Sequence, residues 1–126
     1  DIDMDHIAAV QTLSGTGACR IGALFLAQFW PRHPIFCPDP TWGNDITIFQ
    51  QSGLAVHQYR YYDRRTNRVD IVGMLDDLRH KAPSGSIILL HACAHNPTGC
   101  DLTIEEWKQV VAVIREKEHI AFFDSA

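Results

Sequence analysis

The chain has 126 residues, with 11 Lys plus Arg against 15 Asp plus Glu, which gives a formal net charge of −4. Hydrophobic residues make up 46% of the chain and charged residues 21%, as in ordinary globular domains, so the composition excludes disordered and collagen-like classes. The most basic stretch, Arg60 to Arg68, is interrupted by Asp63, and we interpret it as a solvated loop. Because nucleic acids and membrane surfaces are bound through clustered positive charge, we expect neither as a partner.

The longest apolar run, Ile21 to Trp30, is too short for a membrane-spanning helix. The chain does not begin with Met, and its first residues are acidic where a signal or transit peptide would be basic, so we expect a processed or cut piece. Four cysteines without a C-x-x-C pair favour a reducing compartment over a disulfide scaffold.

In the first half of the chain, short β-branched runs alternate with longer periodic stretches. The pattern predicts a strand at Val10–Leu13, then Ser14-Gly15-Thr16-Gly17 followed by a helix to about Trp30, a strand at Ile35–Cys37, a helix over 45–52 and a strand at Ala55–Tyr59. Gly, Pro, Asn or Asp marks each changeover, as expected for turns.

The second half continues the alternation. An amphipathic helix is predicted over 71–81, a strand at Ser86–Ala94, a helix over 104–118 and a nearly all-apolar strand at Ile120–Phe123. The third of these elements begins with a capping box, Thr103–Glu106, in which the Thr hydroxyl and the Glu carboxylate each satisfy a free backbone donor.

Strands separated by helices imply right-handed crossovers and a mostly parallel sheet with helices on both faces, so the predicted fold class is α/β. The apolar strand at Ile120–Phe123 is expected in the centre of this sheet. Ligands of such folds bind outside the carboxyl ends of the strands, so the residues that follow each strand are the candidates for function.

Two of these segments suggest a phosphate and a ring. Ser14-Gly15-Thr16-Gly17 offers hydroxyls and backbone N–H groups at a helix N-terminus, which favours a phosphate, although a plain helix cap is the simpler alternative. Trp42 lies in a loop stiffened by Pro38 and Pro40. It is either a stacking platform for an aromatic ligand or a cover for the edge of the core.

The fourth predicted strand carries potential metal ligands. His91, Cys93 and His95 alternate along it, and Cys100 follows, so a zinc site is one interpretation. Helices should cover that face, and the spacing typical of zinc sites is absent. We therefore favour packed or pocket-lining side chains and predict no metal ligand.

Asn96 and Asp124 complete the candidate site. Asn96 precedes Pro97, and this junction turns the amide toward the end of the sheet. Asp124 follows a buried strand, where a carboxylate is costly unless a cation meets it; a helix cap is the alternative. A phosphate cradle, a ring platform, an amide and a carboxylate at one sheet edge suit a flat, cationic, phosphorylated heteroaromatic such as pyridoxal phosphate.

Four motifs then carry a family resemblance. They are Gln11-Thr12-Leu13-Ser14-Gly15-Thr16-Gly17-Ala18, Pro40-Thr41-Trp42-Gly43-Asn44, His91-Ala92-Cys93-Ala94-His95-Asn96-Pro97-Thr98-Gly99 and Phe122-Phe123-Asp124-Ser125-Ala126. In this order and spacing the chain resembles the aspartate aminotransferase family, fold-type-I pyridoxal-phosphate enzymes of the aspartate and aromatic subgroup. The resemblance implies that residues 1–126 are a central part of the large, cofactor-binding domain, without the N-terminal segment and the C-terminal half of the parent chain.

The resemblance also implies a role for each motif residue. Asp124 would pair with the protonated pyridine nitrogen and Trp42 would stack on the ring, which makes these two the catalytic candidates. The other cofactor contacts would be Ser14, Gly15 and Thr16 to the phosphate, Asn96 to the ring hydroxyl, and Ala126 to the second ring face.

Two further positions lie behind this set. His91 would lie near Asp124. Asp45 stands where the family usually has a histidine that supports the ring-binding aspartate, and a carboxylate there would change the local electrostatics. The resemblance further implies cis peptide bonds before Pro40 and Pro97.

The implied activity is transfer of an amino group between L-aspartate and 2-oxoglutarate by a homodimeric parent enzyme. We expect a cytoplasmic protein, with a mitochondrial isoform as the alternative. None of Lys81, Lys108 and Lys117 lies in the family's Schiff-base motif, so we expect the chain alone to be inactive. The alternatives are an aromatic aminotransferase of the same subgroup, a non-catalytic phosphate- and ring-binding module, and the zinc-binding domain.

Overall fold

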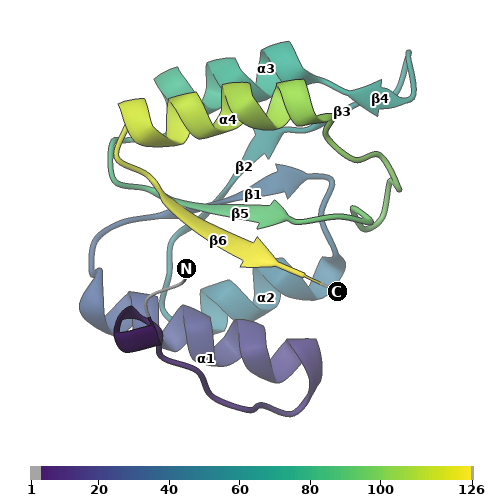
Figure 1. Ribbon diagram of the computed structural model, residues 1–126. Coiled ribbons are helices and arrows are strands. Elements are labelled where there is room, and N and C mark those ends of the chain that lie inside the picture. Colours follow the sequence, from purple (N-terminus) through teal and green to yellow (C-terminus); the bar gives the residue numbers. More distant parts are fainter. Residues whose placement is uncertain (1–3, 126) are drawn as a thin grey trace.

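A four-stranded parallel sheet forms the middle layer of the computed structural model, which describes residues 4–125 (Figure 1). The strands are β1 (Ile35–Asp39), β2 (Val56–Arg60), β5 (Ile87–His91) and β6 (Ile120–Asp124), in the order β2-β1-β5-β6. β1 pairs with both β2 and β5, and β5 pairs in parallel with β6 along its whole length. The predicted α/β class is therefore confirmed.

Helices cover both faces of the sheet. One face carries α1 (Ser14–Phe29) and α2 (Gly43–Gln51), and the other carries α3 (Ile71–Asp76), its π-helical continuation η2 (Asp77–Lys81), and α4 (Ile104–Glu116) (Figure 1). Strand alternation divides the core accordingly, because neighbouring side chains point to opposite faces. Ile87 and Leu89 pack toward α1 and α2, whereas Ile88 and Leu90 pack toward α3 and α4.

Local sequence signals explain how several helices begin and end. The predicted capping box of α4 is present, with the Thr103 hydroxyl accepting from the Glu106 N–H and the Glu106 carboxylate accepting from the Thr103 N–H. Asp70 caps α3 by accepting from the Gly73 N–H. Gly53, with φ of +91°, follows α2 in the left-handed conformation that glycine tolerates.

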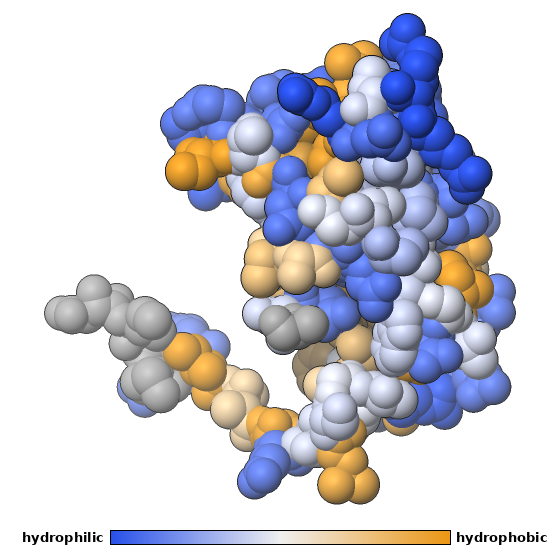
Figure 2. Space-filling view, turned by 90° about the vertical axis from the view of Figure 1, so that its right-hand side faces the viewer, coloured by the Kyte–Doolittle hydropathy of each residue, from blue (hydrophilic) through white to orange (hydrophobic). Residues whose placement is uncertain are grey.

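The strand predicted at Val10–Leu13 is wrong. After a short 3₁₀ turn, η1 (Met4–His6), residues 7–12 have no regular secondary structure. This segment is mostly exposed and extends away from the body of the protein (Figure 2). A strand needs a hydrogen-bonding neighbour, and none lies beside this segment in the described part of the chain.

The stretch predicted as a solvated loop contains a small hairpin. β3 (Tyr62–Asp63) pairs with β4 (Arg68–Val69) in antiparallel register. Arg60, at the end of β2, contacts the carboxylates of Asp76 and Asp77. One end of the arginine-rich stretch is therefore held against η2 and is not free in solvent.

Two other predictions about strands are corrected. β5 ends at His91, so Cys93 and His95 do not continue an alternating strand. β6 lies at the edge of the sheet formed by residues 4–125, although its apolar sequence predicted a central place. Two of its side chains, Ala121 and Phe123, are accordingly exposed. None of the described helices is long and apolar enough to span a membrane.

Candidate active site

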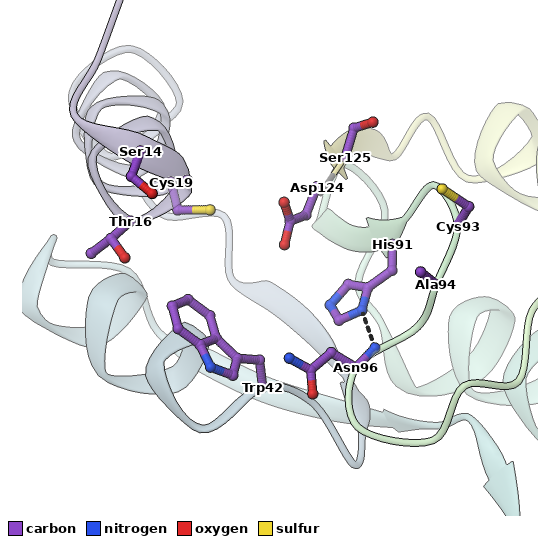
Figure 3. Close-up of a pocket in the computed structure, with 11 residues that line it drawn as sticks. Ser14, Thr16, Cys19, Trp42, His91, Cys93, Ala94, Asn96, Asp124 and Ser125 are labelled. Carbon is purple, nitrogen blue, oxygen red and sulfur yellow. Dashed lines mark hydrogen bonds between the residues drawn. The ribbon is translucent and has the colours of Figure 1, made fainter.

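A cavity of about 520 Å³ opens at the carboxyl ends of β5 and β6. The start of α1 and the loop before α2 complete its walls (Figure 3). It brings together almost all of the residues predicted to form the site. Its lining consists of Ser14, Gly15, Thr16, Cys19, Trp42, His91, Cys93, Ala94, Asn96, Asp124 and Ser125.

The first turn of α1 forms one wall. Its N-cap residue, Leu13, provides no side-chain cap, so the first N–H groups of the helix lack a side-chain acceptor. A Cβ at Gly15 would meet no atom within 4 Å, which leaves the backbone open to a ligand. The Ser14 and Thr16 hydroxyls lie at the same wall (Figure 3). This end of the cavity suits an anion.

Asp124 forms the opposite wall. It ends β6 directly beside His91 of β5, and its carbonyl accepts from the Ala92 N–H at 2.8 Å. Its half-buried carboxylate points into the cavity and accepts no hydrogen bond from another side chain among residues 4–125 (Figure 3). A ligand that brings a cationic N–H to this wall would supply the missing partner.

Trp42 is the residue immediately before α2, and its indole ring lies on the cavity wall between the first turn of α1 and Asn96 (Figure 3). Trp42 is partly exposed and lines the cavity, which favours the ring platform over the alternative that it only covers the edge of the core. A flat ring between the anion end and Asp124 could stack on this surface.

The loop after β5 carries Asn96 to the cavity. The Asp101 carboxylate accepts from the backbone N–H groups of Ala94 and His95, each at 2.9 Å, and these bonds lower the pKa of Asp101. The Asn96–Pro97 bond is cis, as is Asp39–Pro40, which confirms both predicted cis bonds.

His91, which lines the cavity, lies next to Asp45 behind it. The Nε2 atom of His91 is 3.6 Å from Oδ2 of Asp45, and both side chains are at least 95% buried. The Asn96 N–H donates to Nδ1 of His91 at 3.2 Å, so in the neutral ring the proton resides on Nε2 and faces Asp45. The Thr41 hydroxyl donates to Oδ2 of Asp45 at 2.6 Å, whereas Oδ1 has no hydrogen-bond partner in the described part of the chain.

Cys19 is a cavity residue that the sequence analysis missed. It is four residues after Gly15 on α1, so helical spacing could have placed it on the same face. Burial, followed by the nearby Asp124 and Asp45 carboxylates, raises the pKa of the Cys19 thiol to about 11. The thiol of the ligand-free protein is therefore protonated at neutral pH.

The zinc-ligand set considered from the sequence is not assembled. Cys93 is exposed in a bend, His95 stacks on Tyr61 with ring centroids 3.8 Å apart, and the Cys100 thiol donates to the Asn67 carbonyl. Among the described residues, the cluster of possible metal ligands is a different one, formed by Cys19, Asp45 and Asp124.

Ala126 and the lysines named in the sequence analysis are not among the described residues that line the cavity. Ala126 lies outside the described residues. Of the lysines, Lys81 donates to the Gln58 carbonyl and Lys108 contacts Glu105 on α4. No lysine lines the cavity in the part of the chain that the structure describes.

Comparison with known proteins assigns a family to this arrangement. The family model for aminotransferase class I and II matches residues 1–126. The cytoplasmic aspartate aminotransferase of Oryza sativa subsp. japonica is 50% identical over 125 residues, which is 99% of this chain and 30% of the relative. The chain thus spans about 30% of the length of the curated relatives that it matches first.

Solved structures agree with this assignment. Cytoplasmic aspartate aminotransferase from Saccharomyces cerevisiae superposes with a TM-score of 0.92 at 46% identity, covering 96% of this chain and 29% of that one. An aromatic-amino-acid aminotransferase from Burkholderia pseudomallei, covalently bound to pyridoxal phosphate, gives a TM-score of 0.88 at 43% identity. This superposition covers 91% of the present chain and 29% of the Burkholderia chain.

Proposed function

The chain belongs to the aminotransferase class I and II family, and from this premise we propose that it forms the cofactor-binding part of a pyridoxal 5′-phosphate-dependent aspartate aminotransferase. In this proposal residues 1–126 are a central part of the large domain of a longer enzyme. The enzyme exchanges an amino group between L-aspartate and 2-oxoglutarate. The names of the relatives support this substrate pair.

The observation that carries the proposal is the position of Asp124 across the cavity from the uncapped start of α1. One wall offers N–H donors for a phosphate, and the other offers a carboxylate without a side-chain partner among the described residues. A phosphorylated pyridine whose nitrogen carries a proton satisfies both walls at once. The cavity volume, about 520 Å³, is in the range of cofactor sites.

Each cavity residue then has a specific task. The N–H groups at Gly15 and Thr16, with the Ser14 and Thr16 hydroxyls, hold the phosphate. Trp42 orients the ring by stacking, and Asn96 donates to the ring hydroxyl oxygen. Asp124 keeps the proton on the pyridine nitrogen; the bound cofactor supplies an electron sink for the carbon of the amino acid that loses its proton.

His91 and Asp45 support Asp124 from behind. His91 is the residue of β5 that pairs with Asp124 of β6, and its Nε2 atom lies 3.6 Å from Oδ2 of Asp45, whose carboxylate has an oxygen within 4.8 Å of the Asp124 carboxylate. Among residues 4–125, no lysine lines the cavity, so none of the described lysines is placed to attach the cofactor covalently. We therefore propose that these residues bind the cofactor and that the covalent attachment needs an amine from elsewhere in the enzyme.

The proposed enzyme is a homodimer in the cytoplasm. Relatives named as cytoplasmic, mitochondrial and chloroplastic enzymes all match this chain, so family membership alone does not fix the compartment. An aromatic-amino-acid substrate is the second candidate, because solved aromatic aminotransferases are 41% and 43% identical to the chain.

The experiment is a cofactor titration of the full-length gene product, followed by absorbance, with L-aspartate and L-phenylalanine added in separate arms. We expect saturable binding of pyridoxal phosphate, and a spectral change on addition of aspartate that is larger than the change with phenylalanine. The reverse preference would assign the aromatic reaction. Saturable binding without a response to either amino acid would favour a non-catalytic module.

A matched pair of variants makes the test specific to the site. Asp124→Asn should weaken binding of pyridoxal phosphate, whereas Glu105→Gln removes an exposed carboxylate of α4 and should leave binding unchanged. Equal binding by both variants in a folded protein would contradict the proposed role of Asp124.

A further inference from the structure

Three ligand-type side chains from distant parts of the sequence meet below the cavity. They are Cys19 of α1, Asp45 of α2 and Asp124 at the end of β6. The Cys19 sulfur and one carboxylate oxygen of each Asp lie within 4.8 Å of one another. Cys19 and Asp45 are buried, and Asp124 is half-buried at the cavity wall.

This cluster lacks positive charge. Among the described residues, the only basic side chain within 4 Å of either carboxylate is His91, at 3.6 Å from Asp45. Because the Asn96 N–H donates to Nδ1 of His91, the neutral ring offers a single N–H group, on Nε2, and carries no charge. Two carboxylates held this close favour a bound cation.

The two carboxylate oxygens of Asp45 have different surroundings. Oδ2 is anchored by the Thr41 hydroxyl at 2.6 Å and faces the N–H of His91. Oδ1 is buried and has no hydrogen-bond partner among residues 4–125, and the whole residue is 0% exposed. Carboxylates that bind metals are commonly held by hydrogen-bond donors on one oxygen, which leaves the other oxygen available to the metal.

We propose that Cys19, Asp45 and Asp124 form a binding site for one Zn²⁺ ion in the cofactor-free protein. One thiolate and two carboxylates are a ligand set that zinc accepts, with the fourth position filled by water from the open cavity. Zn–S bonds of about 2.3 Å and Zn–O bonds of about 2.0–2.2 Å place tetrahedral ligand atoms about 3.5 Å apart, so the three side chains, whose ligand atoms lie within 4.8 Å of one another, draw together when zinc binds.

Binding involves a proton transfer from the chain. The Zn–S bond forms as the S–H bond of Cys19 breaks, and the released proton passes to water; no oxidant or reductant takes part. The two carboxylates beside the thiol would share the ion, whose positive charge stabilises the thiolate.

The zinc site overlaps the proposed cofactor site, because both use the Asp124 carboxylate. A carboxylate that coordinates zinc cannot at the same time pair with a pyridine nitrogen. Zinc and pyridoxal phosphate should therefore exclude each other, and zinc would delay loading of the cofactor.

The test uses Co²⁺ as a spectroscopic substitute for Zn²⁺ on the full-length gene product without bound cofactor. We expect a thiolate-to-cobalt charge-transfer band that saturates at one equivalent and disappears when Zn²⁺ is added. Cys19→Ser should abolish the band. Cys93→Ser, which removes the exposed thiol at the rim of the same cavity, should retain it.

The carboxylates are tested by affinity. Asp45→Asn should weaken Co²⁺ binding by about tenfold or more while circular dichroism shows a folded protein. Preincubation with Zn²⁺ should slow the binding of pyridoxal phosphate by wild type but not by Cys19→Ser.

Several results would overturn the site: no charge-transfer band in wild type, a band that persists in Cys19→Ser, or a band lost in Cys93→Ser. If the band is absent while pyridoxal phosphate binds normally, the zinc site is wrong and the proposed function stands. If the band appears and pyridoxal phosphate does not bind, the zinc site stands and the proposed function is wrong.

Discussion

The Nε2 atom of His91 lies 3.6 Å from Oδ2 of Asp45, in a part of the protein where both side chains are almost fully buried. This distance is too long for a strong hydrogen bond, and Oδ1 of Asp45 has no hydrogen-bond partner within residues 4–125. Asp45 therefore pays the desolvation cost of a buried polar group with little compensation. Such under-satisfied groups are typical of functional sites, where binding of a ligand supplies the missing interaction.

Asp45→Asn should stabilise the ligand-free protein. The amide oxygen can keep the bond from Thr41 at the position of Oδ2. We expect a gain of about 1 kcal/mol in the free energy of unfolding, because a buried charge is replaced by a neutral group of the same shape. Chemical denaturation at neutral pH measures it. An unchanged or lower stability would show that Asp45 is already satisfied.

Asp124→Asn should separate binding from folding. Loss of a charged partner for a cationic N–H costs about 1.5–3 kcal/mol, or about 10- to 150-fold in the dissociation constant of pyridoxal phosphate. Asp124 is half-buried and accepts no side-chain hydrogen bond among the described residues, so the unfolding midpoint should change little. Equilibrium dialysis and thermal unfolding on the same preparation test both. A loss of stability comparable to the loss of affinity would make Asp124 a structural residue.

Features with a local cause were predictable from the sequence. The capping box of α4 needs only Thr103 and Glu106, three positions apart, and the structure has both of its bonds. The strand-end rule placed Trp42, Asn96 and Asp124 at one sheet edge, and all three line one cavity. Ser14 lines the same cavity, although the strand predicted before it is absent from the described residues.

Features that depend on distant partners were not predictable in the same way. Val10–Leu13 has the residues of a strand but no strand to pair with in residues 4–125. β5 ends at His91, and the Asp101 carboxylate accepts hydrogen bonds from the backbone of the loop that follows. The meeting of Cys19 with Asp45 joins α1 to α2 over 26 positions, and nothing in the spacing of the sequence indicates it.

His95 should make the protein sensitive to mild acid. Burial, followed by the nearby His91, lowers the pKa of His95 from 6.5 to about 4. Below pH 6.5 His95 is protonated in the unfolded chain, but in the folded chain it stays neutral down to about pH 4. The free energy of unfolding therefore falls as the pH decreases from about 6.5 to about 4. The full loss is on the order of 3 kcal/mol.

Denaturant unfolding at pH 7, 5.5 and 4.5 measures this effect of His95. His95→Phe, which keeps a ring against Tyr61, should flatten the pH dependence in that window. His80→Gln, which removes an exposed histidine, should leave it as in wild type. A pH dependence that persists in full in His95→Phe would assign the effect to another group.

Gly22 should be irreplaceable where α1 crosses β6. A Cβ at Gly22 would lie 2.7 Å and 2.9 Å from two ring atoms of Phe122, and that ring is held edge-on against Phe49. Overpacking of this kind costs about 1–3 kcal/mol, which exceeds the gain of about 1 kcal/mol from replacing a helical glycine by alanine. Gly43→Ala is the matched control, because a Cβ there meets nothing within 4 Å at the start of α2. Thermal unfolding should therefore place Gly22→Ala below wild type and Gly43→Ala at or above it. If both variants were equally stable, Phe122 would be free to move, and the α1 wall of the cavity would be less firmly held than this packing indicates.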